Sequence, residues 1–181
     1  MKGLFDLSGK KAVLVGAGDL GSSMLESLLE YGASAVVIGR GEGPSDLVIE
    51  QRNRGFEVSH VHADISDTDQ INESFKAALE ILEGIDILIN IAGIQRRCKS
   101  EDFPLDDWND VINVNLTATF TFCQLAAQEM LKQGQGKIIN IASMLSFFGG
   151  FTVPAYAASK GGVMQLTKAL ANEWACSGIN V

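Results

Sequence analysis

Short apolar segments alternate with longer segments of helical periodicity along this 181-residue chain. The apolar segments are rich in β-branched and aliphatic residues, and they predict strands at residues 12–15, 36–38, 56–61, 85–89 and 138–141. Several of them lack the alternation of a strand with one solvated face, so helices should cover both faces of the sheet. The pattern therefore predicts an α/β fold, a doubly wound parallel sheet in a three-layer αβα arrangement.

Helical patterns occupy the gaps between the predicted strands. The first has apolar residues three or four positions apart, and Gly32 follows it as a stop signal. Its stripe consists of Leu20, Met24, Leu28 and Leu29. Further helices are expected at residues 67–83, 108–132 and 154–176, with the turn at residues 104–106 opening the middle one.

A last apolar segment, residues 177–181, begins a sixth predicted strand. The chain contains neither an internal repeat nor a linker of biased composition. We therefore expect one domain over residues 1–181, incomplete at its C-terminal end because only the start of the sixth strand is present.

Composition and charge narrow the classes of partner. The chain is 46% hydrophobic and carries a formal net charge of -8, with an isoelectric point near 4.7. That balance provides no basic surface for nucleic acid or an anionic membrane, so a small molecule is the expected partner. The N-terminus lacks the apolar segment of a signal peptide, and no apolar run has the length of a membrane span, so we expect a cytoplasmic protein.

Neither cysteine nor histidine usage indicates a metal site. Cys98, Cys123 and Cys176 are widely separated and form no Cys-x-x-Cys pair, which is typical of reduced packing residues. His60 and His62 share one face of a strand, but two histidines without a third ligand do not complete a site. We expect no bound metal.

The first predicted strand runs into a glycine-rich turn that opens the first helix. The turn has the pattern Gly-x-Gly-x-x-Gly and comprises Gly16, Ala17, Gly18, Asp19, Leu20 and Gly21. Glycines at such a turn allow close backbone approach, and the helix N-terminus offers free N–H groups to a pyrophosphate. The turn therefore predicts a Rossmann-type dinucleotide site, although the same glycines would also serve helix–strand packing alone.

The end of the second strand is where such a site distinguishes NAD from NADP. Arg40 stands there without an acidic neighbour, which favours the 2′-phosphate of NADP(H), whereas a solvated surface arginine is the alternative. Asp64 and Ile65 follow the third strand as further candidates for nucleotide contact. The Asp64 carboxylate either meets the adenine edge or caps the following turn.

Tyr156 and Lys160 stand one helical turn apart if Pro154 begins the last helix. An ammonium beside a phenol, whose reference pKa is about 10, favours the phenolate and suits the phenol to acid–base chemistry near neutral pH. Ser143 follows a strand, where it can bond a carbonyl oxygen, and Asn115 lies in a predicted helix at a cost in helix propensity. Either these residues form a catalytic group, or Asn115 bonds its own helix and the Tyr–Lys spacing is accidental.

These motifs, in this order, resemble the short-chain dehydrogenase/reductase family over residues 4–181. They are the glycine turn, Asn90-Ile91-Ala92-Gly93, Asn115, Ser143 and Tyr156-Ala157-Ala158-Ser159-Lys160. Residues 92–97, 141–147 and 171–175 look most like 2-deoxy-D-gluconate 3-dehydrogenases, with gluconate 5-dehydrogenases and 3-oxoacyl carrier-protein reductases as alternatives. The resemblance implies an oxidoreductase that transfers a hydride between NAD(H) or NADP(H) and a sugar-acid alcohol or ketone.

The resemblance also implies a role for each matching residue. Tyr156 would be the general acid/base, Lys160 would lower its pKa and hold the nicotinamide ribose, and Ser143 would orient the substrate oxygen. Asn115 would support a water that relays protons to Lys160. The cofactor cleft would be lined by Asn90, Ala92 and Gly93, and the substrate would lie against Ser143, Met144, Arg96 and Arg97. The two arginines either pair with a sugar-acid carboxylate or form surface salt bridges.

Three features depart from the family pattern. The glycine turn is one residue shorter than usual, and Ile91 replaces the second asparagine of Asn-Asn-Ala-Gly. The family also continues past position 181 with its last strands, a substrate-covering segment and a strand used in homo-tetramer assembly. The alternative to an enzyme is therefore a non-catalytic, truncated remnant that binds a nucleotide.

Overall fold

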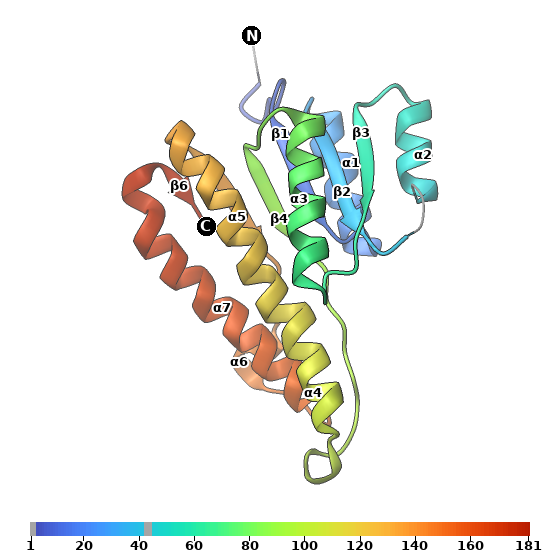
Figure 1. The fold of residues 1–181 in the computed structure, drawn as a ribbon, viewed down its shortest axis with the longest axis vertical. Helices are drawn as coiled ribbons and strands as arrows, with labels where there is room; N and C mark the ends of the chain where they lie inside the picture. Colours follow the sequence, from blue (N-terminus) through green and yellow to red (C-terminus); the bar gives the residue numbers. More distant parts are fainter. Residues whose placement is uncertain (1–2, 42–44) are drawn as a thin grey trace.

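The computed structural model describes residues 3–41 and 45–181, which form a six-stranded sheet with helices on both faces (Figure 1). The strands are β1 (Lys11–Val15), β2 (Ser34–Gly39), β3 (Val58–His62), β4 (Ile87–Asn90), β5 (Gly136–Asn140) and β6 (Ile179–Asn180). The helices are α1 (Asp19–Glu30), α2 (Asp46–Asn53), α3 (Thr68–Leu82), α4 (Leu105–Ile112), α5 (Ala118–Gln133), α6 (Leu145–Phe148) and α7 (Pro154–Trp174). Shorter turns are the 3₁₀ segments Ser100–Asp102 and Ala175–Ser177 and the π-helical segment Asn113–Thr117.

All neighbouring strands are parallel, in the order β3-β2-β1-β4-β5-β6. The order reverses at β1, because β2 and β3 lie on one side of it and β4 to β6 on the other. A crevice forms at the carboxyl ends of parallel strands where the order reverses. Val15 ends β1 beside Ile38 and Asn90, so the loops after β1, β2 and β4 meet there. The predicted doubly wound α/β fold is confirmed.

Two apolar clusters pack the two faces of the sheet. Successive strand residues point to opposite faces, so Val13 joins one cluster and Leu14 the other. The first cluster includes Phe75 of α3, Phe122 of α5 and Leu170 of α7. The second joins α1 and α2 to the opposite face. Figure 1 accordingly shows α3, α5 and α7 in front of the sheet and α1 behind it.

The apolar stripe predicted for the first helix is partly wrong. Leu28 and Leu29 are buried as expected and Met24 is half-buried, but Leu20 is 51% exposed. Leu25, which the predicted stripe omits, is fully buried against the sheet. Leu20 lies in the first turn of α1, at the carboxyl ends of the strands, so it faces the crevice instead of the core.

The long helix expected over residues 108–132 begins earlier, at Leu105, and contains the π-helical turn. Two helices were not predicted, α2 and α6. Helix α2 buries only Val48 and Gln51, so it carries almost no apolar periodicity. Helix α6 has four residues, too few to show a period.

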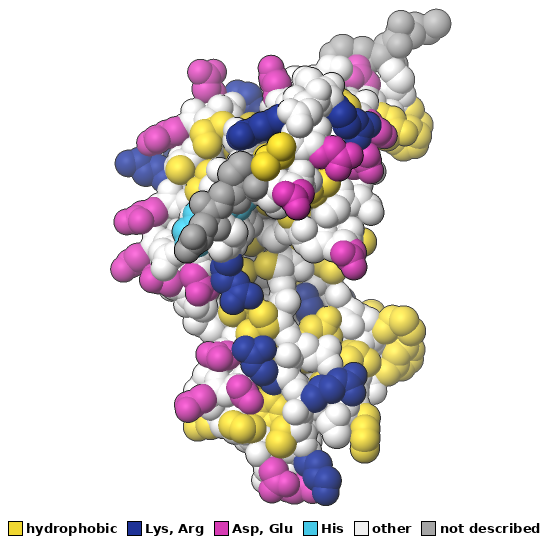
Figure 2. Space-filling view, turned by 90° about the vertical axis from the view of Figure 1, so that its right-hand side faces the viewer, with side chains coloured by type: hydrophobic (Ala, Val, Ile, Leu, Met, Phe, Trp, Pro, Cys, Tyr) yellow, Lys and Arg dark blue, Asp and Glu magenta, His cyan; other side chains and the backbone are white. Residues whose placement is uncertain are grey.

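Among the described residues, no helix combines the length and the hydropathy that a bilayer crossing needs. Figure 2 shows acidic and basic side chains interspersed over one face of the molecule, with apolar side chains between them. The coloured Lys and Arg side chains of that face form no continuous stripe of the kind that follows a nucleic-acid backbone.

Candidate active site

A cleft of about 470 Å³ opens where the order of strands reverses. The glycine turn, the carboxyl ends of the central strands and one side of α7 enclose it. It brings together these predicted residues: Gly16, Gly18, Asp19, Leu20, Gly21, Arg40, Asp64, Ile65, Ala92, Gly93, Tyr156 and Lys160. The predicted residues outside its lining are Asn90, Arg96, Arg97, Asn115, Ser143 and Met144.

Two of the three glycines in the turn are required by the backbone. Gly16 has a φ of +91°, and a β-carbon there would come within 2.9 Å of the Ala92 backbone. A β-carbon on Gly21 would lie 2.8 Å from the Gly16 carbonyl oxygen. The short turn therefore packs β1, α1 and the loop after β4 as closely as backbone contact allows.

Gly18 is not required in that way. A β-carbon on Gly18 would meet no atom within 4 Å, so packing does not demand a glycine there. Gly18 is also the N-cap of α1, and no side chain caps the first N–H groups of that helix. Free N–H groups at an open helix N-terminus fit the oxygens of a pyrophosphate.

Arg40 and Asp64 flank the cleft at the ends of β2 and β3. The Asp64 carboxylate accepts hydrogen bonds from the Ser66 N–H at 3.0 Å and from the Ser66 hydroxyl at 2.8 Å. These bonds, with a smaller contribution from the Arg40 charge, hold the pKa of Asp64 below its usual value. Asp64 thus caps the following turn, the second of its two predicted roles, while it still lines the cleft.

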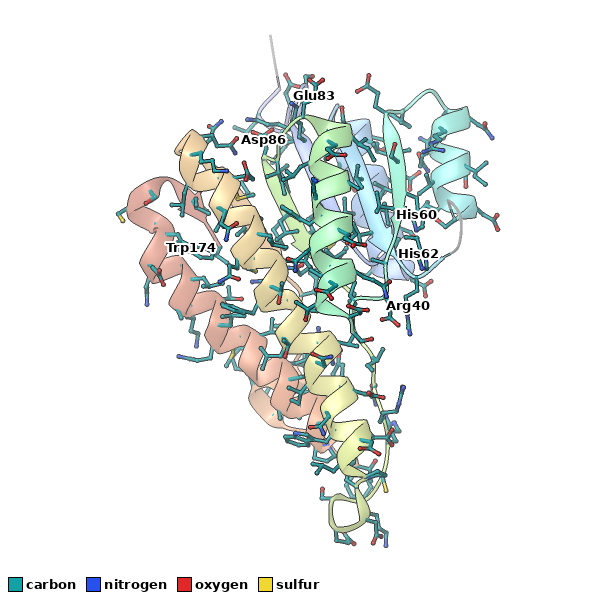
Figure 3. All side chains as sticks on the ribbon, viewed as in Figure 1. Arg40, His60, His62, Glu83, Asp86 and Trp174 are labelled. Carbon is teal, nitrogen blue, oxygen red and sulfur yellow. The ribbon has the colours of Figure 1, made fainter. Side chains whose placement is uncertain are left out.

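The two histidines lie on β3 near Arg40 (Figure 3). His62 Nδ1 is 3.0 Å from the Gly41 carbonyl oxygen. Burial lowers the pKa of His60, with the charges of His62 and Arg52 adding to the effect. Across residues 3–41 and 45–181, no group of three or more His, Cys, Asp or Glu side chains is arranged to hold a metal ion.

Tyr156 and Lys160 lie one turn apart near the start of α7, whose first residue is Pro154. Lys160 is 4% exposed, and its Nζ donates to the Ile141 carbonyl oxygen at 2.7 Å. The same nitrogen lies 6.0 Å from the centroid of the Tyr156 ring. Burial lowers the pKa of Lys160. The pair places a cation beside a phenol at the edge of the cleft.

Asn115 ties the loop after β4 to α7. It is fully buried in the π-helical turn, where its Oδ1 accepts from the Ile94 N–H at 2.8 Å and its Nδ2 donates to the Ile94 carbonyl oxygen at 2.9 Å. Its Nδ2 also donates to the Ser159 hydroxyl at 3.0 Å. A β-carbon on Gly93 would lie 3.3 Å from Asn115 Oδ1 and 3.6 Å from Lys160 Nζ. The Asn115 side chain therefore bonds a neighbouring loop and helix, not its own helix.

Ser143 and Met144 lie in the turn that leads from β5 into α6. Ser143 Oγ accepts from the Leu145 N–H at 3.1 Å, and no hydrogen bond joins Ser143 to Tyr156 in the described part of the chain. Ser146 Oγ donates to the Lys160 carbonyl oxygen at 2.8 Å, which fixes the turn to α7. Met144 is 73% exposed beside it.

The two arginines after β4 differ in their surroundings. Arg96 Nε lies 3.6 Å from Asp107 Oδ1, so Arg96 forms the surface salt bridge that was the alternative to substrate binding. Arg97 is exposed and has no hydrogen-bond or ion-pair partner among residues 3–41 and 45–181. Of these two residues, Arg97 is therefore the one with a free guanidinium.

Asn90 lies beneath the cleft, at the end of β4. It is 4% exposed, and its Nδ2 donates to Asn140 Oδ1 at 2.9 Å and to Cys123 Sγ at 3.4 Å. Its Oδ1 is buried without a partner among the described residues. Asn90 thus joins β4 to β5 instead of lining the cleft.

Part of the lining was not predicted from the sequence. These residues are Ile38, Gly39, Ala63, Ile91, Ile94, Val114, Ile141 and Ala142. Most are apolar and resemble core residues in their segments. Except for Val114, which lies in the π-helical turn, their one sequence signal is their position at or after the ends of predicted strands, which converge at one edge of a parallel sheet.

Comparison with known proteins gives one family. Residues 10–181 match the family model described as short chain dehydrogenase. The chain is 47% identical over 184 residues to 2-dehydro-3-deoxy-D-gluconate 5-dehydrogenase of Bacillus subtilis, an alignment that covers 98% of this chain and 70% of that protein.

Solved structures share the fold, and this chain spans about 70% of their length. One is a candidate 2-deoxy-D-gluconate 3-dehydrogenase from Agrobacterium tumefaciens with bound NADP, with a TM-score of 0.89 and 43% identity over 98% of this chain and 70% of that one. Another is a gluconate 5-dehydrogenase from Burkholderia cenocepacia in complex with NADP and tartrate, with a TM-score of 0.90 and 37% identity over 97% and 69%. With this coverage and identity, the chain belongs to the short-chain dehydrogenase family and is an NAD(P)-dependent oxidoreductase of the kind that acts on CH–OH donors.

Proposed function

We propose that this chain catalyses reversible hydride transfer between a nicotinamide cofactor and a secondary alcohol or ketone of a sugar acid. The observation that carries the proposal is the placement of Tyr156 and Lys160 at the edge of the cleft that contains the glycine turn. The names of the relatives, 2-dehydro-3-deoxy-D-gluconate 5-dehydrogenase and gluconate 5-dehydrogenase among them, support the substrate class. Oxidation at carbon 3, as in 2-deoxy-D-gluconate 3-dehydrogenases, and at carbon 5 are both within this proposal.

Tyr156 is the proposed general acid in the direction of reduction. When bound, the nicotinamide supplies the hydride that the carbonyl carbon accepts. Tyr156 gives its phenolic proton to the carbonyl oxygen, so ketone, hydride and proton together yield the alcohol. Lys160 stabilises the phenolate that is left, because an adjacent cation favours the charged form. In the direction of oxidation, the phenolate takes the hydroxyl proton.

The supporting residues have narrower roles. Ser143 orients the substrate oxygen. Asn115 holds the loop that carries Gly93 in place and supports a water through which Lys160 exchanges protons. We assign the substrate carboxylate to Arg97, whose guanidinium is free, with Arg96 and Met144 as further substrate contacts beyond the lining of the cleft. A guanidinium binds a carboxylate through two parallel hydrogen bonds, and a relative was solved with tartrate, a hydroxy acid.

NADP(H) is the preferred cofactor in this proposal. The pyrophosphate lies against the glycine turn, Asp64 and Ile65 lie near the adenine, and Ala92 and Gly93 border the nicotinamide side. Arg40 is exposed at the rim after β2, where a cation attracts a 2′-phosphate. Two related structures that contain NADP support the same preference.

Turnover assays test the proposal. Purified protein is mixed with NADP⁺ or NAD⁺ and 2-deoxy-D-gluconate, 2-dehydro-3-deoxy-D-gluconate or gluconate, and reduced cofactor is followed by absorbance. Tyr156→Phe should lower kcat at least about 100-fold, because the ring stays while the proton is lost. Tyr31→Phe, the matched control on the exposed end of α1, should leave kcat unchanged.

Other results of these assays would favour the alternative functions. Turnover of a 3-oxoacyl thioester but of no sugar acid would make the chain a 3-oxoacyl reductase. Dinucleotide binding without turnover of any substrate would indicate a non-catalytic nucleotide-binding protein. Arg97→Ala with an unchanged KM for every sugar acid would remove the carboxylate assignment.

We also propose that the chain is a cytoplasmic homo-oligomer. A shallow apolar groove runs between the π-helical turn, α5 and α7, and it includes Leu116, Phe120, Leu166 and Ala169. An apolar groove on two adjacent helices suits the same helices of a second copy. Light scattering that gives a monomer at all concentrations would overturn this assignment.

A further inference from the structure

Asp19 places a carboxylate in the part of the cleft where the proposed dinucleotide brings its pyrophosphate. Asp19 is the first residue of α1, directly after the N-cap Gly18, and it is exposed and lines the cleft. Its side chain has no hydrogen-bond or ion-pair partner within residues 3–41 and 45–181. The carboxylate is therefore not neutralised by the protein.

We propose that Asp19 limits the affinity of this cleft for dinucleotides by repelling the pyrophosphate. The inference rests on the function proposed above, and the ligand is indicated by more than the helix terminus. Gly18 leaves the start of α1 open where packing does not require it, and two related solved structures contain NADP. Like charges that approach within a few ångströms at a partly solvated surface oppose binding.

The other charges of the cleft do not offset Asp19. The charged residues of its lining are Asp19, Arg40, Asp64 and Lys160. Arg40 follows β2, and its charge acts on Asp64. Lys160 Nζ is bonded to the Ile141 carbonyl oxygen. Residues 16–21 contain no Lys or Arg, so no side-chain cation within the turn offsets the repulsion from Asp19.

The same carboxylate stabilises the helix that it begins. A negative charge in the first turn interacts favourably with the partial positive charge at the helix N-terminus. Removing the charge should therefore lower the stability of the free protein slightly and raise its affinity for dinucleotide. A residue that merely supported the fold would change both quantities in the same direction, which makes the opposite signs diagnostic.

The test compares Asp19→Asn and Asp19→Ser with the wild type, by calorimetric titration with NADPH and with NADH and by thermal unfolding without ligand. The matched control is Asp46→Asn, because Asp46 is likewise the first residue of a helix, α2, but does not line the cleft. A second probe is 2′-AMP, which carries a 2′-phosphate but no pyrophosphate. Titrations are run at low ionic strength and again at about 0.5 M salt, where exposed charges are largely screened.

We expect both Asp19 variants to bind NADPH at least about threefold and up to about tenfold more tightly than the wild type. A gain of this order is what removing one partly screened charge repulsion gives. The gain should shrink at high salt, while 2′-AMP binding and the Asp46→Asn variant should stay within about twofold of the wild type. A smaller gain, or weaker NADPH binding by folded Asp19 variants, overturns the inference alone. If folded wild type and variants all fail to bind NADPH and NADH, the proposed function falls and the inference with it.

Discussion

Asn115 and Ile94 form a reciprocal pair of hydrogen bonds, in which the side-chain amide of one accepts from the N–H and donates to the carbonyl oxygen of the other. An asparagine in a helical segment lowers helix propensity. Here the cost is offset because Asn115 satisfies two backbone groups of the loop after β4 and also reaches Ser159 of α7. Asn115 lies within the π-helical turn, and its Oδ1 is the nearest atom that a β-carbon on Gly93 would meet, at 3.3 Å.

Replacing Asn115 with alanine should therefore destabilise the fold. The substitution removes the bonds to both Ile94 backbone groups and to Ser159 in a fully buried site, so we expect a loss of roughly 2–5 kcal/mol in the free energy of unfolding. Urea denaturation measures it. Asn113→Ala is the matched control in the same turn, because Asn113 donates one bond, to the Ser66 carbonyl oxygen at 2.8 Å, and should cost about 1 kcal/mol. Equal losses for the two variants would contradict the assignment.

The buried ammonium of Lys160 should make stability depend on alkaline pH. Burial lowers the pKa of Lys160 from its usual 10.5, so between the folded value and 10.5 the unfolded chain binds more protons at this group. The free energy of unfolding then rises with pH across that window, because the cost of burying the charge is fully present below the folded pKa and is relieved above it.

Comparison with Lys160→Met isolates that contribution. The difference in the free energy of unfolding between wild type and variant, from urea denaturation at about pH 7 and about pH 9.5, should shift in favour of the wild type at the higher pH. Lys168→Met, an exposed lysine on the same helix, should show no such shift. Parallel pH profiles for wild type and Lys160→Met would show that the Lys160 pKa is not lowered in the folded chain.

Substitutions at two glycines of the glycine turn should affect different properties, the stability of the fold at Gly16 and the binding of NADPH at Gly18. Gly16→Ala forces a β-carbon into a positive-φ residue 2.9 Å from the Ala92 backbone, so we expect it to lower the free energy of unfolding by roughly 2–4 kcal/mol. Gly18→Ala meets no protein atom and should change that free energy by less than about 1 kcal/mol, yet its methyl group projects at the open start of α1 and should weaken NADPH binding. Chemical denaturation and calorimetric titration of both variants measure the two effects. A Gly18→Ala variant that binds NADPH as tightly as the wild type would contradict the assignment of the cofactor to the glycine turn.

Alternating strands and helices, together with the glycine turn, were enough to predict the parallel sheet and the place of the cleft. The apolar periodicity of the sequence could not locate the π-helical turn between α4 and α5. One extra residue in a helical turn leaves the apolar pattern within each flanking helix intact. The periodicity also assigned Leu20 to the core, since Leu20 is apolar and stands four residues before Met24, whereas the structure places it in the lining of the cleft. Spacing placed Arg96 and Arg97 together, whereas only three-dimensional contacts show that Asp107 neutralises Arg96 alone.

The three cysteines should react with alkylating reagent in the order of their exposure and thiolate content. Burial raises the pKa of Cys123 to about 12, and its thiol lies between Asn90 and Asn140 in the core, whereas Cys176 is exposed and Cys98 is half-buried. Because the thiolate is the reactive form, iodoacetamide at about pH 8 should label Cys176 first, then Cys98, and Cys123 at least about 100-fold more slowly. Peptide mass spectrometry over time follows each site, and the same reaction in concentrated urea, where all three should react alike, is the control. Labelling of Cys123 at the rate of Cys176 in the native protein would mean that the core between β4, β5 and α5 opens readily.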